Sequence, residues 1–238
     1  MNLTIAGMTF QALLGRRRAL LLLPMPVLLI GLTLIGHLTG AHVSTWGPIV
    51  LGQLGLGVIL PLTALIVGSS VLGLEIEDGT ITHILAKPLP RSEIVLAKLA
   101  VAWAVTTVAT AVPLAAAGAI AGGAALAAGV GIGGAVGALA YSSAFLALSL
   151  LTRRPVGMGL LYIILWENLL VSFVSGARVL SVREYSTVLA RGISGSDALP
   201  ALDLAPMAAA LLAAAFVIGG TVLATSRLRS FRLTGETS

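Results

Sequence analysis

Few side chains in this 238-residue chain could do chemistry. It has no cysteine, and its three histidines lack metal-ligand spacing with each other or with carboxylates. The glycine-rich run 129–134 lacks the Lys-Ser/Thr pair of a phosphate-binding loop. No set of His, Ser and Asp and no paired intramembrane aspartates suggest a membrane protease. We therefore expect no catalytic residue, no metal site and no cofactor bound by this chain, and we do not expect an enzyme.

Glu167 is the exception, because it lies near the middle of the apolar run 160–173. An ionisable residue inside a membrane usually faces the bundle interior or a wet cavity. Glu167 is either a protonated or hydrogen-bonded structural acid, tied to Ser or Thr on a neighbouring segment, or a functional residue. In the functional interpretation it lines a translocation path together with Asn168, or forms a polar hinge. We expect no basic residue at its depth and therefore no buried salt bridge.

The composition indicates the elements that position these residues. The chain is 58% hydrophobic and 10% charged, with a mean hydropathy of +1.06, whereas a soluble domain carries about 25% charge. We therefore predict an all-α, polytopic integral membrane protein forming a single transmembrane domain. The expected spans are 19–39, 49–74, 99–121, 131–151, 156–175 and 206–226.

The N-terminal residues 1–18 are expected to form an amphipathic helix in the membrane interface. The apolar run after Arg16, Arg17 and Arg18 has the length of a span, so we expect an uncleaved first span rather than a signal peptide. Glycines 129, 133 and 137 recur at every fourth position, which lets helix backbones approach closely in lipid. We predict ordinary packing within the bundle for this stripe, rather than a specific dimer face.

The basic residues predict the topology. Six spans place both termini on one side, and eleven of the fourteen Lys and Arg residues fall on that side. The other three are Arg178, Arg183 and Arg191. By the positive-inside rule, both termini (with the tail 227–238) and the stretch 75–98 are cytoplasmic. The net charge of +5 therefore indicates topology and lipid headgroup contacts rather than nucleic-acid binding.

Two polar stretches are expected to contain short helices. In 75–98, Asp78 and Gly79 begin a helix over 80–86, and Pro88 ends it. Ile81, Ile84 and Leu85 share its apolar face. In the outer loop 176–205, Ser181 and Glu184 fit a capping box. Val182, Tyr185, Val188 and Leu189 then share a face, so a short helix should lie at the outer membrane surface or dip into it.

These motifs resemble a known family. The acid followed by Gly79-Thr80-Ile81, then Ile84-Leu85-Ala86, Pro88, Arg91 and Lys98, is similar to the first cytoplasmic loop of bacterial ATP-binding-cassette (ABC) permeases of the type-two exporter family. Trp166-Glu167, followed by 176–181 and Tyr185, resembles the fifth span and outer helix of that family. The six-span layout agrees over essentially the whole chain. Pro90 departs from the pattern, in which a small hydroxyl residue caps the third span.

The resemblance implies that a short coupling helix docks into a groove on a separate ATPase subunit. The residues that it assigns to ATPase coupling are Glu77, Asp78, Gly79, Thr80, Ile81, Ile84, Leu85, Pro88 and Arg91. It makes Ser181, Glu184 and Tyr185 part of an outer, lid-like helix. It also implies ABC ATPase subunits that bind ATP and Mg, a second permease copy or a related permease, and contact with membrane lipid. An extracytoplasmic accessory protein is a further partner that it allows.

The expected function is that of an exporter permease in the cytoplasmic (inner) membrane, moving a hydrophobic or amphipathic substrate outward. Within the family, the alternative is a permease for maturation of an extracytoplasmic metalloenzyme, to which His37 and His42 add little. Outside it, the chain could be a membrane anchor or sensor partner of an ATPase, or an ion-coupled secondary carrier with Glu167 as its proton site. A carrier predicts internal repeats, and none is convincing.

Overall fold

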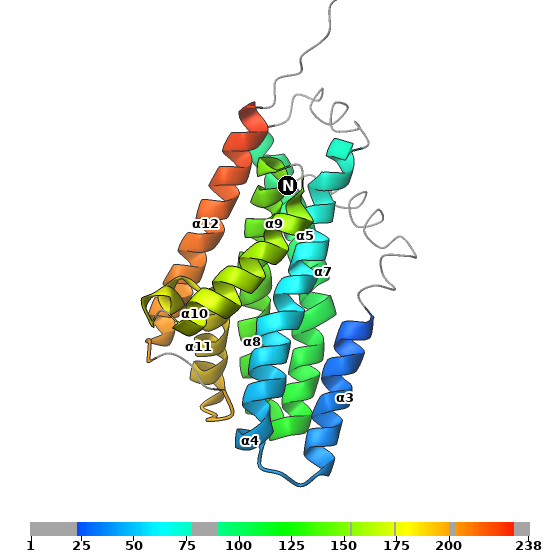
Figure 1. Cartoon of the computed structure of the whole chain (residues 1–238), viewed down its shortest axis with the longest axis vertical. Coiled ribbons are helices and arrows are strands. Elements are labelled where there is room, and N and C mark those ends of the chain that lie inside the picture. The colour runs from blue at the N-terminus through cyan, green and yellow to red at the C-terminus, as the bar shows by residue number, and fades with distance from the viewer. Residues whose placement is uncertain (1–22, 78–89, 153, 174, 200–202, 231–238) are drawn as a thin grey trace, which may run out of the picture.

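The computed structural model describes residues 23–77, 90–152, 154–173, 175–199 and 203–230 (Figure 1). Throughout these ranges the regular structure is helical, and they contain no strand. Three of the helical stretches are long and apolar enough to cross a membrane, namely Val43–Val71, Arg91–Leu151 and Pro206–Ser230. Pro24–Leu38 and Pro155–Leu170 are shorter apolar stretches. The prediction of an all-helical, polytopic membrane protein is therefore confirmed.

The first two apolar segments form an antiparallel pair. Helix α3 (Pro24–Leu38) has prolines in its first turn, where the missing N–H costs no hydrogen bond. The chain turns at Gly40, whose φ of +69° suits glycine. It then runs through α4 (Val43–Gly47), the π-helical η1 (Pro48–Ile59) and α5 (Leu60–Glu77) without a break. A Cβ built on Gly36 would lie 2.7 Å from the Trp46 ring, so this glycine lets α3 and α4 pack closely.

The third and fourth segments form a hairpin. They comprise α7 (Arg91–Thr106), the π-helical η2 (Thr107–Ala111) and α8 (Val112–Leu151). Within α8, Gly122 and Gly123 leave helical geometry, the latter at φ +78°, and reverse the chain. A Cβ on Gly118 would lie 2.9 Å from the Cα of Ala127, so the backbones of the two arms pack in close contact. The second arm therefore begins directly after Gly123, earlier than the residue 131 that the sequence predicts, because the small-residue run is helical rather than a loop.

Helix α8 is the centre of the bundle. The helix packs against α3, α5, α7, α9, α11 and α12. Its buried aromatic residues Tyr141 and Phe145 belong to a core that α3, η1 and α5 complete from the other side. Much of the remaining surface is apolar, as expected for a protein that faces lipid.

The fifth segment and the outer loop complete the fold. Helix α9 (Pro155–Leu161), the π-helical η3 (Tyr162–Leu170) and α10 (Val171–Phe173) run obliquely across the bundle in Figure 1. The 3-10 segment η4 (Ser175–Leu180) then reverses the chain into α11 (Val182–Ser194), which lies along α8. Helix α12 (Pro206–Ser230) returns past α8 to the end where the tail begins (Figure 1). Gly192 of α11 touches Pro206, the first residue of α12.

Candidate functional site

The Glu167 side chain is fully buried, and both of its oxygens accept hydrogen bonds. Oε2 accepts a bond from the hydroxyl of Ser181. Oε1 accepts bonds from the backbone N–H of Val182 at 3.1 Å and from the hydroxyl of Tyr162 at 3.2 Å. One carboxyl group thus joins η3 to the first residues of α11. The hydrogen-bonded interpretation of Glu167 is therefore correct in its geometry, and the neighbouring hydroxyl is that of Ser181.

The same contacts explain how α11 begins. Ser181 is the N-cap residue, and its Oγ accepts a bond from the Glu184 N–H at 3.3 Å, as the capping box predicts. The backbone N–H of Ser181 donates to the Arg178 carbonyl at 3.1 Å. The Glu167 carboxyl adds an acceptor at the positive end of the helix, where an acidic group is favourable. Glu167 is thus a second cap, supplied by another segment.

Side chains also form hydrogen bonds with the backbone carbonyls of the turn before α11. The Trp166 indole N–H donates to the Leu180 carbonyl at 3.4 Å, and the Tyr185 hydroxyl donates to the Val179 carbonyl at 2.6 Å. Arg178 Nε donates to the Val171 carbonyl at 3.2 Å. Irregular backbone within a membrane needs such partners, because lipid offers none. We call this unit the Glu167 cluster, which consists of Tyr162, Trp166, Glu167, Arg178, Ser181 and Tyr185.

The cluster rests on an aromatic stack. The rings of Tyr141 and Phe145 are stacked with centroids 5.9 Å apart. Phe145 meets the ring of Tyr162 edge-on at 6.2 Å. These contacts connect the second arm of α8 to η3 through Tyr162, whose hydroxyl donates to Glu167. A shift of η3 therefore has to displace either this stack or the start of α11.

Helix α11 begins deep in the apolar part of the bundle. The Arg183 side chain in its first turn packs on Gly57, the central residue of the apolar stretch Val43–Val71. Ser186, in the next turn, packs against Gly137 of α8, and Leu60 of α5 contacts the same glycine. The outer loop therefore dips into the bundle, as one of the two expected placements has it, and does not lie at the surface. The expectation of no basic residue near the depth of Glu167 was wrong, since Arg183 follows directly on a residue bonded to that carboxyl.

The glycine stripe of α8 makes room for α11. Gly129, Gly133 and Gly137 each face small residues of α11, which are Ser194, Ala190 and Ser186. A Cβ on Gly133 would overlap the Ser186 carbonyl oxygen and would lie 3.0 Å from the Ala190 Cβ. The pairs run in opposite directions along the two helices, so the helices are antiparallel. The prediction of packing within the bundle is confirmed.

Gly133→Ala is therefore expected to destabilise the protein by about 1–3 kcal/mol, because a fixed backbone carbonyl occupies the space of the new methyl group. Thermal unfolding of the purified protein in detergent measures the effect. Gly219→Ala is the matched control, because a Cβ built there meets nothing within 4 Å. Equal unfolding temperatures for the two variants would contradict the close packing of α8 on α11.

The other sequence-predicted residues lie elsewhere. Asn168 is exposed, whereas Glu167 is fully buried, and the Nδ2 of Asn168 donates to the Ile163 carbonyl at 2.9 Å. The two candidate path residues therefore face different surroundings. The coupling residues Asp78, Gly79, Thr80, Ile81, Ile84, Leu85 and Pro88 lie outside the described residues. Glu77 ends α5, Pro90 occupies the N-cap of α7, and Arg91 is the first residue of that helix.

The burial of Lys98 against α5 was not predicted from the sequence. It was counted among the residues flanking the membrane, yet it is 0% exposed. Its Nζ donates to the Val71 carbonyl of α5 at 3.0 Å, 27 positions away in the chain. Its position at the boundary between a polar stretch and a span does not indicate that it is buried. The bond ties α5 to α7, the two helices that flank the stretch 78–89.

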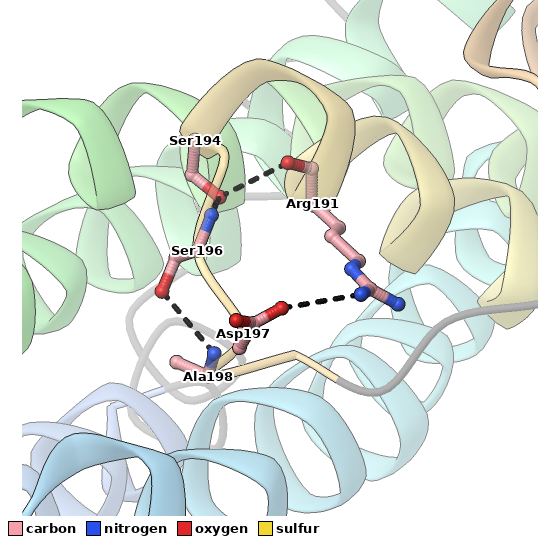
Figure 2. A network of polar contacts seen from close by, with 5 residues as sticks. All are labelled: Arg191, Ser194, Ser196, Asp197 and Ala198. Carbon is pink, nitrogen blue, oxygen red and sulfur yellow. Dashed lines mark hydrogen bonds and ion pairs between the residues drawn. The ribbon is translucent and has the colours of Figure 1, made fainter.

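An exposed polar network closes the other end of α11 (Figure 2). Arg191 pairs with Asp197 at 3.2 Å, with 45% and 89% of the two side chains exposed. Ser194 bonds the Arg191 carbonyl, and Ser196 accepts a bond from the Ala198 N–H at 3.2 Å. Gly195 ends the helix at φ +61°. An ion pair this exposed contributes little to stability, so the network shapes the loop and carries no chemistry.

An apolar groove lies beside the Glu167 cluster. It has a volume of about 440 Å³ and lies between α8, the α9–η3 segment and α12. Tyr162 and Trp166 of the cluster contribute to its wall, and Phe216 of α12 closes the opposite side. A second groove of about 430 Å³ between α8 and α12 shares Ala144, Leu148 and Phe216 with it. The pair forms a continuous apolar trough suited to hydrocarbon. Three or more potential metal ligands do not come together anywhere in the part of the chain that the structure describes.

Comparison with known proteins agrees with this arrangement. A family model for ABC-2 family transporter proteins matches residues 5–181, about three quarters of the chain. The match includes the stretch 75–98, Glu167 and the start of α11 at Ser181. No curated protein matches the chain. The chain belongs to the ABC-2 family of transporter proteins, and it is a membrane permease of an ABC transport system.

Proposed function

We propose that this permease is the membrane-spanning subunit of an ATP-driven exporter that moves a hydrophobic or amphipathic molecule outward. It would cross the cytoplasmic (inner) membrane six times, with both termini in the cytoplasm. The sequence assigns eleven basic residues to one side and three to the other, and without the buried Lys98 and Arg183, which lies within the bundle, the ratio of ten to two still supports that orientation. The working transporter would contain two permeases, as a homodimer or with a related permease, and two ABC ATPase subunits.

The observation that carries the proposal is the bonding of Glu167 to the buried start of α11. This carboxyl makes η3 and α11 one mechanical unit at the centre of the bundle. A rearrangement of the fifth segment would then also move α11, which covers the outer half of α8. An exporter needs such a link between a moving span and an outward exit.

The cytoplasmic input would arrive through the stretch 78–89. The described helices on either side of it, α5 and α7, are joined by the bond from Lys98 to the Val71 carbonyl. A force applied to that stretch by a partner ATPase would therefore displace both helices together. Helix α5 packs on α8 and α9, and this carries the displacement toward η3.

The substrate class follows from the apolar groove. Its wall consists of residues such as Leu148, Met158, Leu165 and Phe216, with the Tyr162 and Trp166 side chains next to the Glu167 cluster. An acyl chain or a similar apolar group would fit such a wall. The position of Glu167 favours this function over an ion-coupled carrier. A proton site has to be reached from water, and Glu167 is fully buried.

Reconstitution in proteoliposomes tests the proposal. The permease with its ATPase is expected to move a fluorescent acylated probe only when ATP is supplied on the ATPase side. Omitting the ATPase, or using a non-hydrolysable ATP analogue, should abolish the movement. Transport that is driven by a proton or sodium gradient in the absence of the ATPase would overturn the exporter assignment.

A further inference from the structure

Arg183 is a cation in the first turn of α11, and it is partly buried. Its side chain lies on the backbone of Gly57 in η1. A Cβ built on that glycine would lie 3.1 Å from Cδ, 3.3 Å from Nε and 3.4 Å from Nη1 of the arginine. Glycine at this position is therefore what allows the guanidinium to lie flat against η1. The charge is held at the centre of the apolar stretch Val43–Val71 and not at its ends.

This guanidinium has five N–H donors and needs acceptors. Among the described residues it makes no hydrogen bond and no ion pair. The acid next to it in the chain, Glu184, is buried and has interactions of its own, and Glu167 already has both oxygens engaged by Ser181, Val182 and Tyr162. The first turn of a helix is also the positive end of its dipole, so α11 itself disfavours a cation there.

Other basic residues described near the bundle differ in this respect. Lys98 donates to a carbonyl of α5, and Arg178 donates to the carbonyl of Val171. Arg191 pairs with Asp197 at the exposed end of α11. A charged side chain at membrane depth is costly unless a partner or a wet cavity compensates it. Arg183 thus has the properties of a residue whose partner is another molecule.

We propose that Arg183 binds the anionic head group, a phosphate or carboxylate, of an amphipathic molecule at mid-membrane depth. The planar guanidinium matches such groups with two parallel hydrogen bonds. Gln53, one turn before Gly57 on η1, is exposed and carries a further amide on that helix. The molecule is either the transported substrate or a resident lipid. That the molecule is the transported substrate rests on the proposed function, whereas the binding of an anionic head group does not.

The test uses the full permease–ATPase complex in nanodiscs. The probes are a fluorescent phosphatidylglycerol and a phosphatidylcholine with the same acyl chains, and binding is measured without ATP. The unmodified protein is expected to prefer phosphatidylglycerol. Arg183→Gln should weaken its binding about tenfold or more, since a charge-assisted contact is lost, and should leave phosphatidylcholine binding unchanged. Arg183→Lys should retain part of the preference, and Arg191→Gln, which alters an exposed pair, should retain all of it.

Two results would overturn the proposal. One is equal binding of the two lipids by the unmodified protein. The other is a loss of permease dimers in Arg183→Gln with phosphatidylglycerol binding intact, which would make Arg183 a contact between permeases. If Arg183→Gln does not fold, the Arg183→Lys variant and the lipid preference of the unmodified protein still decide the matter.

Addition of ATP then separates the two sources of the anion. Release of phosphatidylglycerol to the outer side that depends on Arg183 supports a transported substrate. Retention of the lipid through turnover supports a resident lipid. Absence of any ATP-driven movement would count against the proposed export, but it would leave the binding result, and hence the anion site, standing.

Discussion

Glu167→Ala is expected to reduce ATP-driven transport at least tenfold while leaving membrane insertion and ATPase association intact. The substitution removes the acceptor of three donors, from Ser181, Val182 and Tyr162. Each buried donor that is left without a partner costs roughly 1–3 kcal/mol. The start of α11 would lose its attachment to η3, although the glycine stripe of α8 would still hold the rest of the helix. Transport by reconstituted protein, compared with thermal unfolding of the same preparation, measures both consequences.

Two variants sharpen this test. Glu167→Gln keeps one acceptor oxygen and should retain an intermediate rate, whereas a role as a proton carrier would make it as inactive as alanine. Asp197→Asn is the control, because that side chain is 89% exposed and its ion pair lies in the exposed network at the end of α11. Normal transport by Glu167→Ala, together with a lowered unfolding temperature, would reduce the Glu167 cluster to a packing role.

Leu85→Asp is expected to abolish association with the ATPase. The sequence predicts a short helix over 80–86 with Leu85, Ile81 and Ile84 on its apolar face, and we propose that this face docks on the ATPase. A carboxylate pressed into an apolar docking groove loses its hydration without gaining a partner. We expect at least a hundredfold loss of affinity, which corresponds to about 2.7 kcal/mol. Pull-down of the ATPase from detergent and its stimulated ATPase activity are the two measurements.

His83→Asp is the matched control for this variant. It introduces the same charge into the same short helix, but His83 lies on the opposite face from Ile81, Ile84 and Leu85. It should bind the ATPase normally. Equal loss of binding in both variants would indicate a general effect of charge. Unchanged binding in Leu85→Asp would show that Leu85 is not part of the surface that docks on the ATPase.

The helical membrane protein and the members of the Glu167 cluster other than Tyr162 could be predicted from the sequence, but their depth could not. Trp166, Glu167, Ser181 and Tyr185 were grouped by resemblance, and the structure joins them through hydrogen bonds. The capping box located the start of α11 almost to the residue. Hydropathy, however, reports how apolar a segment is and not where a polar helix lies. The loop 176–205 contains three arginines, and its helix could therefore lie either at the membrane surface or within the bundle.

Lys98 and the α8 hairpin show two further limits of pattern reading. A lysine at the end of a span usually extends toward the interface, but Lys98 is buried and donates to the Val71 carbonyl. The run 122–137 is rich in glycine, which favours turns, yet most of it is helical. Gly129, Gly133 and Gly137 are used there for contact with α11, a long-range partner that no local pattern reveals.

Affinity purification of the unmodified permease in mild detergent tests the central claim most directly. We expect a separate ATPase subunit with nucleotide-binding motifs to co-purify in stoichiometric amount, and its ATPase activity to depend on the permease. Intact, correctly inserted permease that is isolated alone from several mild detergents would contradict an ATP-driven exporter. That result would bring forward an ion-coupled carrier with Glu167 as its proton site.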